Sequence, residues 1–188
     1  MTTFIPHLSS LSHDIFASPA ASVLLPIALG TAVGYSTRPK QTQQTYLAIK
    51  QPPLRPPPSV FGPVWTVLYG LTGYAAHRAV TSSSSTSPSG LIKTLYAAQL
   101  GLNLAWMPLF FKLRRPALAL ADVVSLLGAN AYLAYLYFRV DAVAGWCALP
   151  YLAWLSFAAY LNTGVGHLNG WDISESTLAT RKALGKDE

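Results

Sequence analysis

Five apolar stretches, each about as long as a lipid bilayer is thick, limit what this chain can fold into. They cover residues 20–37, 59–80, 91–111, 116–138 and 142–168. A helix needs roughly 20 apolar residues to cross a bilayer. Only 11% of the residues are charged, whereas an average soluble domain has about 25%. The sequence therefore predicts an all-α membrane protein, a five-transmembrane-helix bundle.

The segments outside these stretches are polar and divide the chain into three parts. Residues 1–19 carry apolar side chains at helical spacing, so they favour either an interfacial amphipathic helix or a frayed terminus. Residues 20–171 form the predicted transmembrane domain, and residues 172–188 form a polar, mobile tail. Within the domain, residues 38–58 are expected to form a long proline-rich loop, and residues 81–90 a flexible connector.

The basic residues predict an orientation in the membrane. Five crossings place the termini on opposite sides. One side receives only Arg78, Lys93 and Arg139. The other receives Arg38, Lys40, Lys50, Arg55, Lys112, Arg114, Arg115, Arg181, Lys182 and Lys186. The positive-inside rule makes the second side cytosolic, together with the C-terminus. Because the basic residues lie between apolar blocks, the net charge of +6 does not indicate nucleic acid as a partner.

Aromatic and amide side chains recur along one face of several predicted helices. In the second stretch Phe61, Trp65 and Tyr69 are four residues apart and share a face. The third and fifth stretches carry similar rows: Gln99, Asn103, Trp106 and Phe110, then Tyr151, Trp154, Ala158, Leu161 and Asn162. If the rows converge, they line a cavity suited to a flat apolar ligand. Aromatic residues at helical spacing also occur in ordinary core packing, and the spacing alone leaves both interpretations open.

The sequence lacks the residue patterns of common catalytic and metal sites. It contains no His, Cys and acidic cluster with metal-ligand spacing and no glycine-rich phosphate loop. Asp122 is the only acid well inside a predicted span, and we interpret it as a hydrogen-bond partner between helices. Cys147 is the only cysteine, so an internal disulfide is excluded. We therefore expect no bound metal, no required cofactor and no acid–base catalytic residue.

A row of small residues lies on another face of the third stretch. Ala97, Gly101 and Ala105 are four residues apart, roughly opposite Gln99 and Asn103. Small residues at this spacing allow close approach of two helices in lipid. The row predicts either a homodimer through the third helix or close packing inside one monomer.

Four segments resemble one known family. They read "PPLRPPPSVFGPVWTVLYG", "LGLNLAWMPLFF", "ALADVVSLLGA" and "PYLAWLSFAAYLN", and they resemble the translocator protein family. This family is also called peripheral-type benzodiazepine receptors or, in bacteria, tryptophan-rich sensory proteins. The resemblance covers about residues 20–171 and implies a five-helix bundle that binds porphyrins such as protoporphyrin IX or haem, sterols such as cholesterol, and drug-like ligands. It further implies a pocket open toward the cytosol, in the outer mitochondrial membrane or another intracellular membrane.

The same resemblance implies a set of ligand-binding residues. They are Tyr46, Pro56, Pro57, Phe61, Trp65, Tyr69, Asn103, Trp106, Met107, Trp154, Ala158 and Leu161. The prolines are expected to form a stiff, extended lid over the mouth. Leu54 departs from the family, many members of which carry Trp at that position. The family's proposed cholesterol motif is also broken, because Thr163 and His167 replace its Tyr and Arg.

Three functions from different classes follow. The first is a membrane protein that binds tetrapyrroles or sterols as a receptor, sensor, transport carrier or scavenger. The second is an enzyme that degrades porphyrin in light through Trp65 and Trp154. The third is a membrane scaffold whose partner is another membrane protein or a second copy of the chain.

Overall fold

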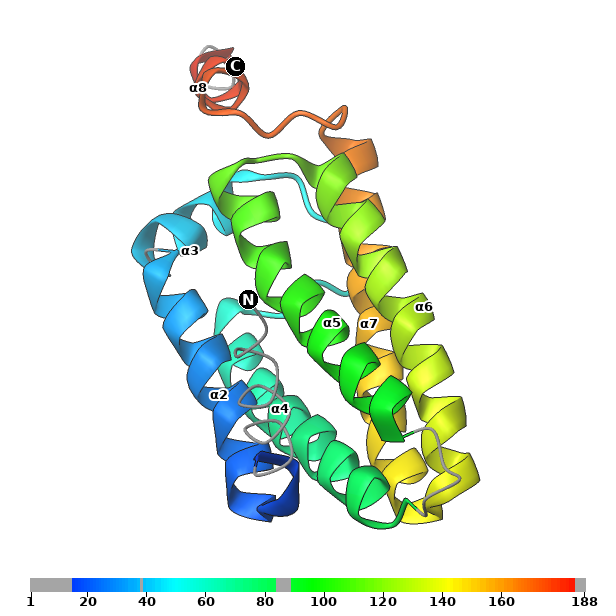
Figure 1. The fold of residues 1–188 in the computed structure, drawn as a ribbon. Helices are drawn as coiled ribbons and strands as arrows, with labels where there is room; N and C mark the ends of the chain where they lie inside the picture. The colour runs from blue at the N-terminus through cyan, green and yellow to red at the C-terminus, as the bar shows by residue number, and fades with distance from the viewer. Residues whose placement is uncertain (1–14, 38, 84–88, 185–188) are drawn as a thin grey trace, which may run out of the picture.

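The computed structural model describes residues 15–37, 39–83 and 89–184. Its elements are α2 (Pro19–Ser36), α3 (Pro39–Ala48), α4 (Pro58–Thr81), α5 (Ser89–Met107), the π-helical turn η1 (Pro108–Lys112), α6 (Pro116–Val140), α7 (Ala142–Leu168) and α8 (Glu175–Leu184). The long helices α2, α4, α5, α6 and α7 lie side by side in one bundle (Figure 1). No strand occurs in these three ranges. The predicted all-α bundle is thus confirmed.

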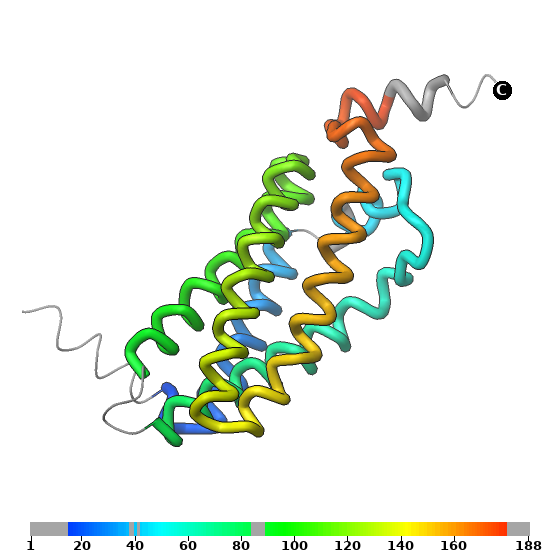
Figure 2. Tube along the Cα trace, turned by 90° about the vertical axis from the view of Figure 1, so that its right-hand side faces the viewer, coloured from blue at the N-terminus to red at the C-terminus, as the bar shows by residue number. Residues whose placement is uncertain are grey.

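The five long helices coincide with the five predicted stretches. Three of them, α2, α6 and α7, are both long enough and apolar enough to cross a membrane. The other two, α4 and α5, have 24 and 19 residues. We call the end of the bundle next to α8 the α8 end, and the opposite end the far end. Figure 2 shows α8 leaving the bundle beyond the end of α7.

Proline and capping residues set where the helices begin. Pro19, Pro58 and Pro116 each stand in the first turn of a long helix, where the missing N–H would have no partner inside the helix. Asp141 caps α7, since its Oδ1 accepts a hydrogen bond from the backbone N–H of Ala144 at 2.9 Å. At Pro108 the same missing N–H interrupts α5, and the chain continues as the wider turn η1.

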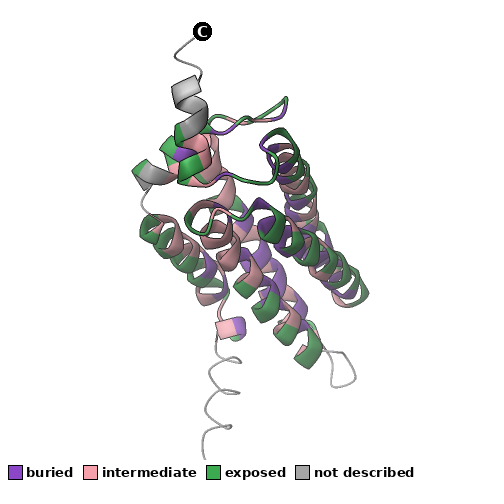
Figure 3. Ribbon diagram, turned by 90° about the horizontal axis from the view of Figure 1, so that it is seen from above, coloured by how far each residue is buried: buried purple, intermediate pink, exposed green. Residues whose placement is uncertain are grey.

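Small side chains pack the far half of the bundle tightly. Ala75, Ala76 and Ala79 of α4 are fully buried there, together with Ala144 of α7. A Cβ atom added to Gly73 would lie 2.0 Å from the carbonyl oxygen of Ser22. The backbones of α2 and α4 are therefore in direct contact in this half, which only a glycine allows. Figure 3 shows the buried residues on the inner faces of the helices.

The structure corrects two predictions about the polar segments. Residues 38–58 do not form an extended loop throughout, because α3 occupies Pro39–Ala48 and the non-helical segment after it turns at Pro53 and Leu54. The predicted mobile tail contains the helix α8. Most of the segment 1–19, for which we expect an amphipathic helix or a frayed end, lies outside the described residues. Its described part packs onto the bundle, where Phe16 is buried and its ring meets Tyr96 edge-on at 5.5 Å.

Candidate functional site

A cavity of about 670 Å³ lies inside the bundle, in the half nearest α8. Side chains from α2, α3, α4, α5, η1, α6 and α7 line it. No Asp, Glu, Lys, Arg or His of the described ranges is among the lining residues. The walls are therefore formed by apolar, aromatic and neutral polar groups, the composition expected of a site for a largely apolar molecule.

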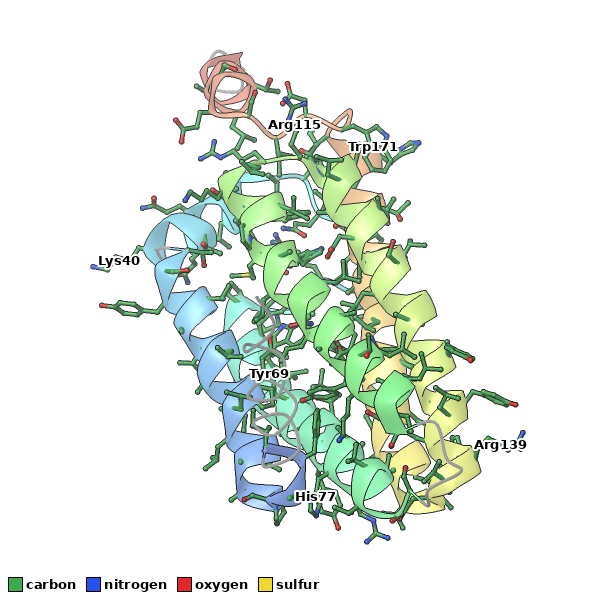
Figure 4. The ribbon with its side chains drawn as sticks, in the orientation of Figure 1. Lys40, Tyr69, His77, Arg115, Arg139 and Trp171 are labelled. Atoms are coloured by element: carbon green, nitrogen blue, oxygen red, sulfur yellow. The ribbon has the colours of Figure 1, made fainter. Side chains whose placement is uncertain are left out.

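One wall of the cavity is aromatic and comes from α4 and α7. The Trp65 ring stands perpendicular to that of Trp154, with centroids 6.5 Å apart, and it lies against Tyr69 at 5.4 Å. The Phe61 ring meets Trp154 edge-on at 6.0 Å. Phe61, Trp65 and Tyr69 are four residues apart on α4, so the helical period brings their rings to one side of the helix. Figure 4 shows Tyr69 pointing into the bundle interior.

The facing wall comes from the end of α5 and from η1. Here the Trp106 ring stacks on Phe110, with centroids 5.0 Å apart and planes 20° apart. Met107 and Phe111 line the cavity beside them. The change from α5 to the wider turn η1 thus occurs at the cavity wall, and Pro108 accounts for it.

Hydrogen bonds between side chains fix the polar groups of the cavity. The Tyr69 hydroxyl donates to Asn103 Oδ1 at 2.5 Å, and Asn103 Nδ2 donates to the Tyr151 hydroxyl at 2.7 Å. Trp106 Nε1 donates to Asn162 Oδ1 at 3.2 Å, while Asn162 Nδ2 donates to the carbonyl of Pro116 at 2.8 Å. These bonds join α4, α5, α6 and α7 and hold the rings in place. The amides therefore orient the walls, and the surface that remains for a ligand is mostly apolar.

The segment between α3 and α4 covers the α8 end of the cavity. The Tyr46 hydroxyl donates to the carbonyl oxygen of Pro56 at 2.7 Å, and Gln51 Nε2 donates to the carbonyl of Tyr46 at 2.7 Å. Burial raises the pKa of Tyr46, and the positive charge of Arg55 opposes the rise only in part. The Tyr46 hydroxyl thus remains a neutral donor that ties α3 to the start of α4.

The cavity contains nearly all of the predicted ligand-binding residues. Pro56 and Pro57 are the exceptions, since Pro58 and Ser59 line it instead. The predicted set also lacks a whole wall that the structure contributes from α2, formed by Ile27, Gly30, Thr31 and Gly34. Gly30 and Gly34 are four residues apart, but this spacing suits close helix packing as well as a cavity wall, so the sequence alone did not indicate the wall. Asn162 was assigned to a stripe in the sequence but not to the ligand set, and the structure places it at the cavity.

The row of small residues on α5 faces away from the cavity. Ala97 and Gly101 are exposed and Ala105 is half-buried. A Cβ atom at Gly101 would meet nothing within 4 Å, so the row does not pack tightly within this chain. Gln99 and Asn103 are buried, as expected for the opposite face.

Two residues singled out in the sequence lie outside the cavity. Asp122 is buried on α6, and its Oδ2 atom has no hydrogen-bond partner in the described part of the chain, so the expected bond between helices is not present at that atom. Cys147 packs against the core of the far half. Among the described residues no group of His, Cys, Asp and Glu could hold a metal ion.

Long apolar helices around an aromatic cavity define the class as an α-helical membrane protein with an internal apolar chamber. Comparison with known proteins gives the family. The TspO/MBR family model matches residues 22–168, and the chain belongs to this family. It is 41% identical to the translocator protein homolog of Schizosaccharomyces pombe over 85% of this chain and 99% of that protein.

Similarity extends to animals and archaea. The human translocator protein is 34% identical over 81% of this chain and 92% of its own length. The tryptophan-rich protein TspO of Archaeoglobus fulgidus is 34% identical over 79% of this chain and 95% of its own length. The resemblance inferred from the four sequence segments is thereby confirmed.

Proposed function

We propose that this protein binds a tetrapyrrole such as protoporphyrin IX in its cavity and acts as a sensor, carrier or scavenger of it. The observation that carries the proposal is the cavity itself, which has a volume of about 670 Å³ and three tryptophans in its walls. Ligand sites generally measure about 300–1,000 Å³ and are mostly apolar. A planar macrocycle can stack against the rings of Trp65, Trp106 and Trp154.

Titration of the purified protein with protoporphyrin IX, followed by tryptophan fluorescence, tests this proposal. We expect saturable quenching that weakens in Trp65→Phe and in Trp154→Phe. Trp146→Phe is the matched control, because Trp146 is on α7 like Trp154 but is 67% exposed and does not line the cavity. Absence of quenching, or equal quenching in all three variants, would refute the assignment.

A second candidate function, light-dependent porphyrin degradation, draws support from the tryptophan pair. Trp65 and Trp154 lie 6.5 Å apart on the same wall, where an indole could donate an electron to an excited porphyrin without an acid–base pair. Illumination of the complex with oxygen should then yield a new chromophore that is absent from Trp65→Phe. Bleaching alone, as with free porphyrin, would leave only the binding function.

The charge distribution, the small-residue row and the apolar cavity each support one further proposal. We propose that the α8 end faces the cytosol, where Lys40 and Arg115 lie (Figure 4), in the outer mitochondrial membrane or another intracellular membrane. We propose a homodimer, or a scaffold contact with another membrane protein, through Ala97, Gly101 and Ala105. We also propose that sterols compete for the same apolar cavity, which a cholesterol competition titration would test.

A further inference from the structure

The cavity is closed at its α8 end by a segment that is fastened to α7. The backbone N–H of Lys50 donates to Asn169 Oδ1 at 3.1 Å, and Asn169 Nδ2 donates back to the Lys50 carbonyl at 2.8 Å. Ile49, one residue earlier, is only 4% exposed and packs with Val165. This reciprocal pair of bonds and the buried side chain hold the start of the segment in place.

Two more contacts fasten the same segment further along. Pro52 packs against Gly164, where an added Cβ atom would lie 2.6 Å from the proline ring. The Tyr160 hydroxyl donates to the carbonyl of Pro53 at 3.0 Å. The segment from residue 49 to residue 53 is thus a roof over the cavity, and a ligand cannot pass it unless these contacts break.

The side of the cavity between α2 and α4 is different, because these helices separate as they approach the α8 end. They touch backbone to backbone at Gly73 and Ser22. Near the middle, a Cβ atom at Gly30 would lie 2.1 Å from the ring of Tyr69, so a side chain and not a backbone fills the space there. Nearer the α8 end, a Cβ atom at Gly34 or at Gly62 would meet nothing within 4 Å.

Each of the two helices carries an internal proline between its close contact and its open end. Pro26 follows Ser22 in α2, and Pro63 lies next to Gly62 in α4. A proline inside a helix removes one backbone hydrogen bond and permits a bend. The sequence of both helices is therefore compatible with separation at this level.

Some residues beside this opening line the cavity and are also exposed on the outer surface of the bundle. Thr31 of α2 and Ser59, Gly62 and Thr66 of α4 line the cavity although they are exposed. Leu29 and Val67, their neighbours on the same helices, are exposed apolar residues at 38% and 61%. Exposed apolar side chains on spanning helices face the hydrocarbon. The opening is therefore bordered by side chains that face the hydrocarbon.

We propose that the gap between α2 and α4 is a lateral portal through which a flat, membrane-dissolved ligand enters the cavity from the bilayer. This inference rests on the proposed tetrapyrrole-binding function. It replaces the expected cytosolic mouth by a membrane-facing one. Much of the rim is made of glycine, serine and threonine, and Tyr69 is the large side chain that a planar molecule meets between the two helices.

Substitutions that narrow the portal test the inference. Gly62→Phe and Gly34→Phe each add a Cβ atom that meets nothing within 4 Å outside its own turn of helix, so the backbone at both positions has room for a side chain, and thermal unfolding checks that each variant folds. In nanodiscs loaded with protoporphyrin IX, we expect both the association rate and the dissociation rate to fall in these variants, whatever the change in Kd, because entry and exit use the same gap. Gly128→Phe is the control, because Gly128 is equally open and exposed on α6 but lies outside the cavity.

A variant of the roof distinguishes the two routes. Tyr160→Phe removes one fastening of the roof, and the portal predicts unchanged rates. Faster association in Tyr160→Phe, or unchanged rates in both Gly62→Phe and Gly34→Phe, would overturn the portal while the binding function stands. A weaker Kd with an unchanged association rate would also overturn it. If the unsubstituted protein binds no protoporphyrin IX, the proposed function and the portal both fail.

Discussion

In the far half of the bundle α2 lies directly against α4 and the alanines of α4 are fully buried, whereas in the half nearest α8 the same two helices enclose a cavity. The difference lies in side-chain size. Gly73 lets the backbones of α2 and α4 meet at Ser22, while nearer the cavity the ring of Tyr69 lies between the two helices, against Gly30. One helix thus combines a packing segment with a binding segment.

The polar groups of the two halves differ in the same way. In the far half they join helix to helix: the Arg78 guanidinium pairs with the Asp141 carboxylate at 2.7 Å, and Asn130 donates to Gln99. In the other half the amides of Asn103 and Asn162 bond to tyrosine and tryptophan side chains and orient the cavity walls. Stability should therefore depend mainly on the far half and ligand affinity on the half nearest α8.

The largest effect is expected from Gly73→Ala. Its Cβ atom would lie 2.0 Å from a backbone oxygen of α2, which cannot rotate away, so α2 must shift. We expect the free energy of unfolding to fall by about 3 kcal/mol, the upper part of the range for overpacking. Thermal unfolding followed by circular dichroism measures the loss. Gly62→Ala in the open half should be neutral, and equal losses in both variants would remove the contrast between the halves.

A large effect on binding, with little effect on stability, is expected from Trp65→Ala. The ring faces a cavity and not a filled core, so its removal costs contact with the ligand. We expect protoporphyrin IX to bind about 30-fold more weakly, or ~2 kcal/mol, as for a buried aromatic anchor. The unfolding temperature and the affinity should be measured on the same samples, with Trp146→Ala as control. A variant that fails to fold would make Trp65 a packing residue.

How well the sequence predicts each half depends on the kind of side chain involved. The stripe of Phe61, Trp65 and Tyr69 follows from the helical period, because large side chains four residues apart must share a face. The α2 wall does not follow, since Gly30 and Gly34 are equally suited to close packing and to an open surface. Only the tertiary separation of α2 from α4 decides between these roles.

The loop between the first two spans illustrates a different limit. Its many prolines favour an extended chain, but after Ala48 the chain is only non-helical and includes a turn at Pro53 and Leu54. They conceal α3, although Pro39 stands in the first turn of that helix and no proline follows it until residue 52. The position of the prolines was therefore more informative than their number.

A pH-dependent effect is expected at the far end from Asp141→Asn. Desolvation alone would raise the pKa of Asp141, but hydrogen bonds from Arg78, the Ala144 backbone and Ser82 outweigh it and lower the pKa below the ordinary 3.8. The carboxylate therefore stabilises the folded state fully above that ordinary value, and the contribution is lost as the pH falls through the lowered pKa.

Thermal unfolding of Asp141→Asn and of the unsubstituted protein between pH 7 and pH 3 measures this contribution. The unsubstituted protein should be the more stable at neutral pH, and the difference should shrink below about pH 4. Ligand affinity at pH 7 should be unchanged, because Asp141 lies outside the cavity. A constant difference at every pH would show that the charge has no part in the stabilisation.

The smallest effect is expected from Leu54→Trp, which introduces the aromatic residue that many relatives of the family carry. Leu54 is 81% exposed and lies outside the cavity. The φ angle of its backbone is 66°, a strained conformation for any residue with a Cβ atom, so Trp adds no new backbone cost. We expect affinities within about twofold of the original, as is usual for exposed positions away from a binding site. A marked gain would show that the chain just after the roof contacts the ligand.

A structure of the protein with protoporphyrin IX bound in a lipid nanodisc tests the central claim most directly. The claim is that the half nearest α8 is a binding chamber and the far half a packed support. It predicts the macrocycle inside the cavity, against the rings of Trp65, Trp106 and Trp154, with the contact between Gly73 and Ser22 unchanged. A macrocycle bound on the outer surface of the bundle, or a cavity filled by collapsed side chains, would contradict it.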